Sequence, residues 1–568
     1  MPERESGLVS AAMVRRLLIL LAFLLTPIAA QAEGGMVSAA DPRAAEAGRE
    51  MLRTGGSAAD AAMAIMLALT VVEPQSSGIG GGGFIVHHDA KTGVIATIDG
   101  RETAPAAARP DRFLAPDGTP MPFVQAVPGG ISVGVPGNIR LMAKAHQRWG
   151  RLPWAKLFEP AIRLADQGFA LSKSSAAVLQ RIRPFDTDFA GLRALYWDGD
   201  APKPAGTLIR NPALAALLRR IAAEGPDAFY TGATAEAIGR AVATAPHNPA
   251  EITAADFAAY QAKDRPPVCG RYRIYRVCGM GPPSSGGIGI LQILGMLDRF
   301  DMKRLGKDSP AAWHLIAEAM MLAYADREKY LGDSDFVSVP VAGLIDPAYL
   351  RQRSRLISPV KSIGRYEPGV PPGAKPRTAS LPMEEKGTTH FVAIDGQGNV
   401  ATMTSTVEGP FGSQLVSEGM MLNNELTDFS FTPEKDGAPV ANRVEPGKRP
   451  LSSMAPTIVY GPDGKVVLAI GSQGGKRIIM NVVKSMVGVL DWGLPVGDAI
   501  ALPNIYFSTD GLMVEAGTTL AAMKPALEKL GHIVTVAEMA SKVNAIERTK
   551  TGWRGGADPR SEGVVLAE

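Results

Sequence analysis

The chain has no excess of charge of either sign. Its 568 residues carry 59 Lys and Arg against 56 Asp and Glu, so the formal net charge is +3 at pH 7. Acids and bases are interspersed, and this balance does not favour nucleic acid or an anionic membrane as a partner. The apolar fraction of 46% is typical of a globular core. At this length we expect several domains or one large layered unit.

Long apolar runs are missing everywhere except near the N-terminus. There Arg15-Arg16 precede the apolar run Leu17 to Leu25, and the small-residue sequence Ala30-Gln31-Ala32 follows. This order predicts a secretory signal peptide of residues 1–32, cleaved after Ala32. The alternative is a membrane anchor, but the run is shorter than the ~20 apolar residues that span a bilayer. We therefore expect an exported protein, periplasmic or secreted, without a membrane segment after signal cleavage.

Cysteine is scarce as well, with only Cys269 and Cys278 in the chain. A two-residue turn at Arg273-Ile274 would pair Tyr272 with Tyr275 and place the two cysteines opposite each other on adjacent strands. An exported location would permit a disulfide there, and two free thiols are the alternative. Two cysteines without nearby His or a second pair do not make a zinc site.

Several catalytic signatures are absent. The seven His are scattered and form no HExxH motif, and the sequence PPSSG at 282–286 lacks the leading Gly of a GxSxG nucleophile elbow. Gly78, Gly80 and Gly83 fit GxGxxG, but the following Phe84-Ile85-Val86 is strand-like rather than helical. A dinucleotide site is therefore excluded by its context.

Other segments have clear periodicity. We expect two helices within Ala40 to Thr70, separated at Gly55-Gly56, and largely helical structure over 133–240. Further predictions are a strand at Val94 to Ile98, a helix at Ala311 to Tyr330 with Met320 and Met321 in the core, and an exposed segment over 358–387 with little to pack. An exposed segment of this kind is where a chain can be cut without loss of the fold.

A glycine-rich turn follows the strand predicted at Lys465 to Ile470. Gly471 to Gly475 lead into an apolar helix that begins near Lys476, and Arg477 stands where a nucleotide-binding P-loop needs Ser or Thr. Backbone N–H groups at a helix N-terminus are unpaired and attract anions. In acyl transfer the anion would be a tetrahedral oxyanion, which glycine lets approach closely.

The most informative step is Gly387-Thr388, at the head of a predicted hairpin. Thr389 to Ile394 and Val400 to Thr406 are strand-like and are joined by a five-residue loop. If Ile394 pairs with Val400, Thr388 lies opposite Thr406, whose hydroxyl could hold that of Thr388. A Thr–Thr pair that serves only the sheet is the alternative.

Cleavage before Thr388 would give one residue both a hydroxyl nucleophile and its own amine base. The chain would then be a self-processing hydrolase or acyltransferase. His390 shares a strand face with Thr388 but lies about 6–7 Å further along the strand, so we expect a packing role for it.

Several long motifs carry a resemblance to a known family. From about Met36 to Ser561 they occur in the order GGSAADAAMA, VVEPQSSGIGGGGF, GRETAP, GPPSSGG, GTTHF, LNNELTDFS, KRPLSSMAPTIV and GSQGGKRI. With them the chain resembles the γ-glutamyltranspeptidase (glutathione hydrolase) proenzymes, a family of N-terminal-nucleophile hydrolases. The resemblance implies an α/β (α+β) fold of four αββα layers. The apolar run Phe391 to Ile394 fits a strand covered on both faces.

The resemblance also assigns roles in catalysis. Thr388 resembles the autoprocessing residue and nucleophile, Thr406 the residue that orients it, and Gly474 and Gly475 the oxyanion hole. Cleavage at Gly387–Thr388 would give a large subunit of residues 33–387 and a small subunit of residues 388–568. The two would form one αββα unit, a heterodimer of the chain's own products.

Substrate contacts follow from the same motifs. Arg101 resembles the residue that clamps the α-carboxylate of a γ-glutamyl group, because a guanidinium fork suits a carboxylate. Ser452 and Ser453 would assist it, while Glu425 and Asp428 would hold the α-ammonium.

Two positions depart from the family pattern. Glu408 stands where many members carry an Asn that helps bind the glutamate. The loop from Phe429 to Gly447 looks shorter than in well-known bacterial members and lacks an aromatic gate residue after Phe431.

The activity implied is transfer of the γ-glutamyl group of glutathione or a related compound to water, an amino acid or a peptide. It would pass through a γ-glutamyl-Thr388 intermediate without a metal or organic cofactor. One alternative is an acylase of the same fold that acts on β-lactam side chains or other amides. Another is an exported, non-catalytic binding protein, against which the intact Thr388, Thr406 and glycine pair argue.

Overall fold

The structure, a computed structural model, describes residues 31–568 except 33, 183–187, 381–386 and 509–510. Almost all of the predicted signal peptide lies outside the described residues. Its last two residues form the short strand β1 (Gln31–Ala32), which pairs with Trp553 and Arg554. Among the described helices, none combines the length and apolar character needed to cross a bilayer.

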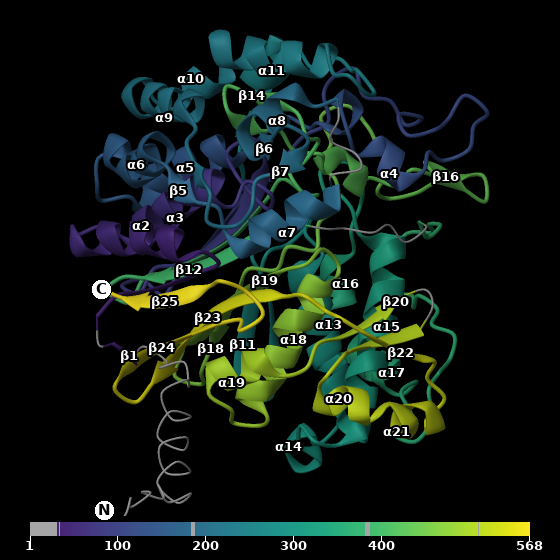
Figure 1. Ribbon diagram of the computed structural model, residues 1–568. Helices are drawn as coiled ribbons and strands as arrows, with labels where there is room; N and C mark the ends of the chain where they lie inside the picture. The colour runs from purple at the N-terminus through teal and green to yellow at the C-terminus, as the bar shows by residue number, and fades with distance from the viewer. Residues whose placement is uncertain (1–30, 33, 183–187, 381–386, 509–510) are drawn as a thin grey trace, which may run out of the picture.

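Two seven-stranded antiparallel sheets form the centre of the molecule (Figure 1). The β12 sheet has the order β25 (Val564–Ala567), β2 (Met36–Ala39), β12 (Thr389–Ile394), β13 (Val400–Thr406), β3 (Gly82–His88), β4 (Ile95–Gly100), β9 (Lys263–Arg265). The β19 sheet has the order β1, β24 (Gly552–Ala557), β23 (Lys542–Thr549), β19 (Val466–Gln473), β18 (Thr457–Tyr460), β11 (Tyr275–Gly279), β10 (Val268–Tyr272).

Helices cover the outer face of each sheet, as Figure 1 shows. The β12 sheet is covered by α2 (Pro42–Arg53), α3 (Ala58–Val72), α5 (Asn138–Trp149) and α6 (Glu159–Gln167), and the β19 sheet by α13 (Gly286–Leu297), α15 (Pro310–Tyr330), α18 (Arg477–Leu490) and α19 (Val496–Ala501). A third apolar core fills the space between the sheets and includes Val86, Val392 and Ile458. The arrangement is the expected four-layer αββα sandwich.

Shorter elements surround these layers. The remaining helical segments are α4 (Phe123–Ala126), η1 (Gly130–Ser132), η2 (Trp154–Phe158), α7 (Lys173–Ile182), α8 (Ala190–Tyr196), α9 (Pro212–Glu224), α10 (Asp227–Tyr230), α11 (Ala233–Ala243), α12 (Ala254–Ala259), α14 (Met302–Leu305), α16 (Val341–Leu344), α17 (Pro347–Ser354), η4 (Glu425–Asp428), α20 (Thr519–Ala522) and α21 (Lys524–Lys529). The small strands are β5 (Phe169–Ala170), β6 (Trp197–Asp198), β7 (Ala201–Pro202), β8 (Leu208–Ile209), β14 (Val416–Ser417), β15 (Met420–Met421), β16 (Glu434–Lys435), β17 (Ala438–Pro439), β20 (Ile505–Ser508), β21 (Gly511–Glu515) and β22 (Val534–Ala537).

Local sequence signals explain the first two helices. Ser57 and Asp60 form a capping box, in which each side chain accepts from the other residue's backbone N–H, and α3 starts behind it. Asp41 caps α2, which has Pro42 in its first turn, and Gly55 takes a φ of 84° between the two helices. The predicted helix pair and its break are therefore confirmed.

The β12–β13 hairpin has the predicted register, from Ile394 opposite Val400 to Thr389 opposite Ser405. Phe391 and Ala393 pack against the helices that cover the β12 sheet, whereas Val392 and Ile394 pack between the two sheets. The strand is covered on both faces, as its apolar run predicts.

The two cysteines form a disulfide across the β10–β11 hairpin. Cys269 lies opposite Cys278 and Tyr272 opposite Tyr275, and the two cysteine Cα atoms are 4.1 Å apart. Of the two states left open by the sequence, the structure shows the bridged one.

Over 358–380, the segment predicted to be exposed with little to pack is more firmly docked than expected, and residues 381–386 of that prediction lie outside the described residues. Glu318 and Asp326 on α15 accept the backbone N–H groups of Ile363 and Gly369 at 2.9 and 2.7 Å, and Ser380 donates its N–H to the Glu328 carbonyl. Composition gave no sign of this docking, because the anchors are buried acids on a distant helix. The predicted burial of α15 holds for Met320, whereas Met321 is half-buried.

Candidate active site

A small cavity between the two sheets brings the predicted site residues together. It is lined by Arg101, Thr388, Thr406, Glu408, Glu425, Asp428, Ser452, Ser453, Met454, Gly475 and Ile478. Its volume is about 10 Å³, room for about one water molecule. Of the predicted residues, only Gly387 and Gly474 do not line it, and each is adjacent in sequence to a residue that does.

Thr388 stands directly before β12 in an unusual backbone conformation. Its φ is 95°, a region that β-branched residues rarely enter. The preceding Gly387 has a φ of 92°, and a Cβ added there would lie 1.4 Å from the carbonyl oxygen of Glu408. The chain therefore requires glycine at 387 and holds Thr388 under strain of about 1–3 kcal/mol.

The backbone after α3 holds the residues directly before β12 and directly after β13. The sequence did not predict this contact. The carbonyl of Ser76 accepts the N–H groups of Thr388 and Val407, both at 3.2 Å. Glu73 accepts hydrogen bonds from the Thr389 hydroxyl and the Lys542 ammonium. The signal available was the mostly polar stretch at 73–77 directly after a helix that is apolar except for Asp60 and Thr70.

Thr406 is the last residue of β13, opposite Gly82 of β3. Its hydroxyl oxygen accepts the N–H of Glu408 at 2.7 Å. A hydroxyl carries one donor besides its acceptor lone pairs, so this bond leaves the O–H of Thr406 able to donate. The bond to Glu408 is one that the sequence did not predict.

Arg101 follows β4 and is 1% exposed. It forms ion pairs with Glu425 and Asp428, which the single turn η4 presents on one side, and it donates to the carbonyls of Pro450 and Leu451 at 3.2 and 3.0 Å. These residues were predicted to hold opposite ends of one ligand, and in this structure they hold each other. Burial alone would lower the pKa of Arg101, but the carboxylates outweigh it and raise that pKa.

Glu102 is a further acid of the site that the sequence reasoning missed. It is fully buried, and its carboxylate oxygens have no hydrogen-bond partner among the described residues. Burial raises the pKa of Glu102 to about 7, against the attraction of Arg101. Burial also raises the pKa of Glu425, and the negative charges of Glu102 and Glu408 add to that effect. The only signal in the sequence was its position beside Arg101.

Glu408, the departure from the family pattern, is buried at the cavity with a φ of 72°. The Asn424 side-chain amide donates to its carboxylate at 2.5 Å and accepts the Gly409 N–H at 2.7 Å. One guanidinium thus faces four carboxyl groups in or beside the cavity, an environment that favours a bound cation such as an ammonium.

The serine pair is held by a helix and a loop that the sequence reasoning did not connect with it. Arg327 of α15 donates to the Ser453 hydroxyl at 2.9 Å and to the Ser285 hydroxyl at 3.0 Å. Ser285 in turn donates its N–H and its hydroxyl to the Ser452 carbonyl, both at 2.7 Å. The motif GPPSSGG therefore positions Ser452 and Ser453.

The glycine turn lies where β19 meets α18. β19 runs through Gln473, further than predicted, and leaves Gly474 and Gly475 as the turn, with φ of 129° and 56°. Their carbonyls accept the N–H groups of Arg477 and Ile478 at 3.1 and 3.0 Å, and Lys476 pairs with Glu328 of α15 at 2.8 Å. Gly475 borders the cavity, as an oxyanion site beside Thr388 requires.

His390 takes no part in the cavity. It is fully buried, its ring nitrogens contact the hydroxyls of Thr404 and Thr402 at 2.8 and 3.2 Å, and a Cβ on Gly471 would collide with its ring. Burial lowers the pKa of His390 to about 3. These contacts agree with the packing role predicted for it.

The loop from Phe429 to Gly447 does not place an aromatic ring over the cavity. Phe431 stacks on Phe113 with ring centres 4.4 Å apart, inside a separate apolar cluster, and the loop beyond it carries the small hairpin of β16 and β17. The predicted lack of an aromatic gate in this loop agrees with that arrangement.

Two stacked antiparallel sheets between helical layers, with a hydroxyl residue behind a glycine at the head of a central strand, define an N-terminal-nucleophile hydrolase. A model of the gamma-glutamyltranspeptidase family matches residues 44–568. The chain belongs to this family and is an enzyme, a γ-glutamyl hydrolase and transferase. The family, fold and class of activity expected from the sequence are thereby confirmed.

Individual relatives agree over most of the chain. The glutathione hydrolase proenzyme of Escherichia coli (strain K12) is 38% identical over 549 residues, 94% of this chain and 91% of that protein. A cephalosporin acylase from Bacillus halodurans superposes with a TM-score of 0.84 at 26% identity, over 96% of this chain and 97% of that one. Helicobacter pylori gamma-glutamyltranspeptidase superposes with a TM-score of 0.57 at 37% identity, over 60% and 97% of the two chains.

Proposed function

We propose that the chain cleaves itself between Gly387 and Thr388. The Thr388 Oγ attacks the Gly387 carbonyl carbon, the C–N bond breaks, and the acyl group passes from nitrogen to oxygen. Water then hydrolyses the ester, which leaves a carboxylate on Gly387, the free hydroxyl and a new α-amine on Thr388. The observation that supports this step is the strained φ of Thr388 next to a glycine that cannot carry a side chain.

The products of this step would be a large subunit of residues 33–387 and a small subunit of residues 388–568, associated as a heterodimer. The signal at residues 1–32 would direct the protein to the periplasm or outside the cell.

The second proposed reaction transfers a γ-glutamyl group. The Thr388 Oγ attacks the γ-amide carbonyl of glutathione or a related compound, and the α-amine of Thr388 takes the hydroxyl proton. The usual pKa of an α-amine, about 7.7–8.0, leaves free base near neutral pH. Gly474 and Gly475 would stabilise the oxyanion and Thr406 would donate to Thr388. Water, an amino acid or a peptide then accepts the acyl group.

The charges in the cavity support an α-amino acid as the part of the substrate that is recognised. Its carboxylate would replace Glu425 and Asp428 on the Arg101 fork and reach Ser452 and Ser453. Its ammonium would lie among Glu425, Asp428 and Glu408. The first two already share the single cation Arg101, and the charge of Glu408 acts on Glu425. No step requires a metal or cofactor.

The test compares wild type with Thr388→Ala and the matched Thr388→Ser, which keeps a hydroxyl. Intact mass under denaturing conditions should show two chains for wild type and for Thr388→Ser. Thr388→Ala should stay a single chain and hydrolyse no γ-glutamyl-p-nitroanilide. A single wild-type chain without turnover would contradict the proposal and support a binding protein.

A second candidate, an amide acylase of the same fold, is favoured by the superposition on a cephalosporin acylase with a TM-score of 0.84. The same experiment separates the two candidates. Two chains without γ-glutamyl turnover, but with release of a β-lactam side chain, would favour the acylase.

A further inference from the structure

Two of the seven histidines meet far from the active-site cavity, beneath the loop that follows α17. His314 and Glu318 are one helical turn apart on α15, and His532 precedes β22. The three side chains are buried, and their ligand atoms all lie within 4.8 Å of one another. The sequence gave no sign of this cluster, because His532 lies more than 200 residues from the other two members.

We propose that His314 Nδ1, His532 Nε2 and a carboxylate oxygen of Glu318 bind a divalent transition-metal ion of the zinc type. Two imidazoles and a carboxylate are a donor set that Zn²⁺ takes in proteins, usually with water as a fourth ligand. The site does not depend on γ-glutamyl chemistry.

The distances are close to those of a metal site. His314 Nδ1 and His532 Nε2 are 2.7 Å apart, and His532 Nε2 is 3.8 Å from Glu318 Oε1. Ligand bonds of ~2.0–2.2 Å in tetrahedral geometry put ligand atoms roughly 3.4 Å apart. The two ring nitrogens would separate by about 0.7 Å, a shift within the reach of side chains.

The hydrogen bonds that His314 and Glu318 make away from the cluster are those that metal ligands usually make. His314 Nε2 lies 2.7 Å from the Ser358 carbonyl oxygen, which can only accept a hydrogen bond. Nε2 therefore carries the ring hydrogen, and Nδ1 keeps a lone pair for a metal. Glu318 accepts from Ser362 and Tyr366 at 2.9 and 2.6 Å and from the Ile363 N–H at 2.9 Å. Oε1 receives the bonds from Ser362 and Tyr366, and Oε2 receives the one from Ile363. A carboxylate has about four lone-pair sites, so one remains on Oε2 for an ion.

The ring of His532 is not fully satisfied by hydrogen bonds. Its Nδ1 is buried without a hydrogen-bond partner among the described residues, and its Nε2 has only His314 within hydrogen-bonding distance. On metal binding the proton moves from Nε2 to Nδ1 of the same ring.

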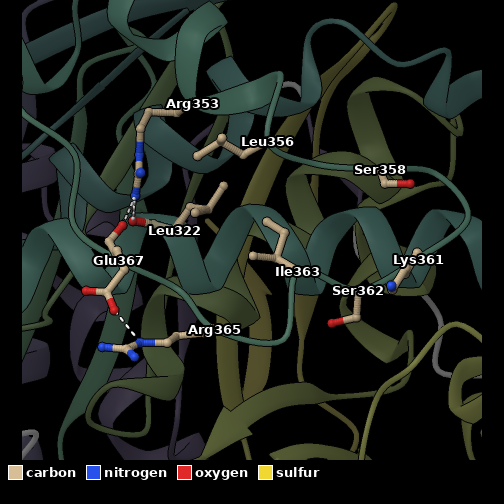
Figure 2. Close-up of a pocket in the computed structure, with 9 residues that line it drawn as sticks. All are labelled: Leu322, Arg353, Leu356, Ser358, Lys361, Ser362, Ile363, Arg365 and Glu367. Carbon is tan, nitrogen blue, oxygen red and sulfur yellow. Dashed lines mark hydrogen bonds and ion pairs between the residues drawn. The ribbon is translucent and has the colours of Figure 1, made fainter.

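A cavity of about 360 Å³ adjoins the residues that cover the cluster (Figure 2). Ser358, Ser362 and Ile363, which form part of its wall, are the same residues that contact His314 and Glu318. The ion would join α15, on one side of the Gly387–Thr388 bond, to His532 on the other. It would therefore bridge the two products of autocleavage.

Metal content of purified protein without a histidine tag tests the site. The protein is stripped with a chelator, dialysed and titrated with Co²⁺, whose visible spectrum reports nitrogen and oxygen ligands, and then with Zn²⁺ in competition. We expect one ion per molecule, whether that molecule is the processed pair of wild-type chains or the single uncut chain of Thr388→Ala. The Kd should be micromolar or lower in both. Binding to the uncut variant separates this inference from the proposed autocleavage.

His532→Gln should weaken binding by more than the roughly 10–100-fold that loss of an outer hydrogen bond causes. The control is His247→Gln, because His247 is exposed and its side chain contacts Asp188 and Phe189, away from the cluster. The affinity of this variant should equal that of wild type. X-ray absorption of wild-type zinc protein should show two imidazoles, which keeps the test valid if His532→Gln does not fold. The absence of saturable binding, equal binding by His532→Gln, or fewer than two imidazoles would overturn the proposal.

Discussion

Thr388 holds a backbone conformation that only the uncut chain requires. Its φ of 95° costs about 1–3 kcal/mol for a residue of this kind. The torsion φ exists because an acyl group is attached to the nitrogen of Thr388, and cleavage replaces that group with a freely turning amine. The proposed autocleavage would therefore release the strain in the same step that creates the base for the second reaction.

At the same scale, Gly387→Ala should block processing. The new methyl group would lie 1.4 Å from the Glu408 carbonyl oxygen, so the backbone must leave the conformation that presents the scissile carbonyl to Thr388. We expect cleavage at least about 100-fold slower, since a small misplacement of reacting atoms has effects of this size. Denaturing electrophoresis of samples taken over time measures the rate.

The matched control for this prediction is Gly373→Ala. Gly373 also has a positive φ, 75°, but a Cβ added there meets nothing within 4 Å. It carries the same backbone penalty without the collision, so its cleavage rate should equal that of wild type. Equal rates for both variants would show that the contact with Glu408 does not matter.

Among the elements, α15 carries an unusual row of buried polar side chains. Its first half holds His314 and Glu318, and its second half holds Asp326, Arg327 and the half-buried Glu328. From the second half, side chains contact Ser453, Ser285 and Lys476, on the loops that border the active site. The helix therefore links the folded loop at 358–380 with the walls of the substrate cavity.

Arg327→Lys should weaken substrate binding without stopping autocleavage. Lysine keeps the charge, but its donors lie on one nitrogen at the end of a flexible chain, whereas Arg327 reaches Ser285 and Ser453 from two nitrogens of a rigid fork. Because Ser453 is proposed to hold the substrate carboxylate, we expect KM for γ-glutamyl-p-nitroanilide to rise by about 10-fold with a smaller change in kcat. Arg351→Lys, at an exposed position of α17, should change neither constant, and an unchanged KM in Arg327→Lys would contradict the positioning role.

Local elements of this fold could be predicted from the sequence, whereas contacts between distant segments could not. The register of the β12–β13 hairpin was predictable because its five-residue loop fixes which residues begin the pairing. A shift by one residue would turn every side chain to the other face of the sheet. The capped helices α2 and α3 were predictable for similar local reasons. The docking of 358–380, and the roles of Glu102 and Arg327, depend on buried contacts between distant segments, which leave no periodic or compositional trace in the sequence.

In the whole molecule, both sheets mix strands from the two sides of the Gly387–Thr388 bond. In the β12 sheet, β12 and β13 lie between β2 and β3, and in the β19 sheet β18 pairs with β11. Neither product of cleavage contains a complete sheet, and the core between the sheets draws residues from both. Each product separated from the other would expose strand edges and apolar faces.

This interleaving predicts that the two chains stay together after cleavage and separate only as the fold is lost. In native buffer the processed enzyme should elute from a size-exclusion column at the volume of uncut Thr388→Ala, which has the same fold in one chain. Over a urea series, loss of the joint peak should follow the unfolding transition seen by circular dichroism, because the sheets cannot lose one chain and keep their pairing. Two separate peaks in native buffer, or separation at urea concentrations where the circular dichroism is still native, would show that the subunits are held by a peripheral contact instead.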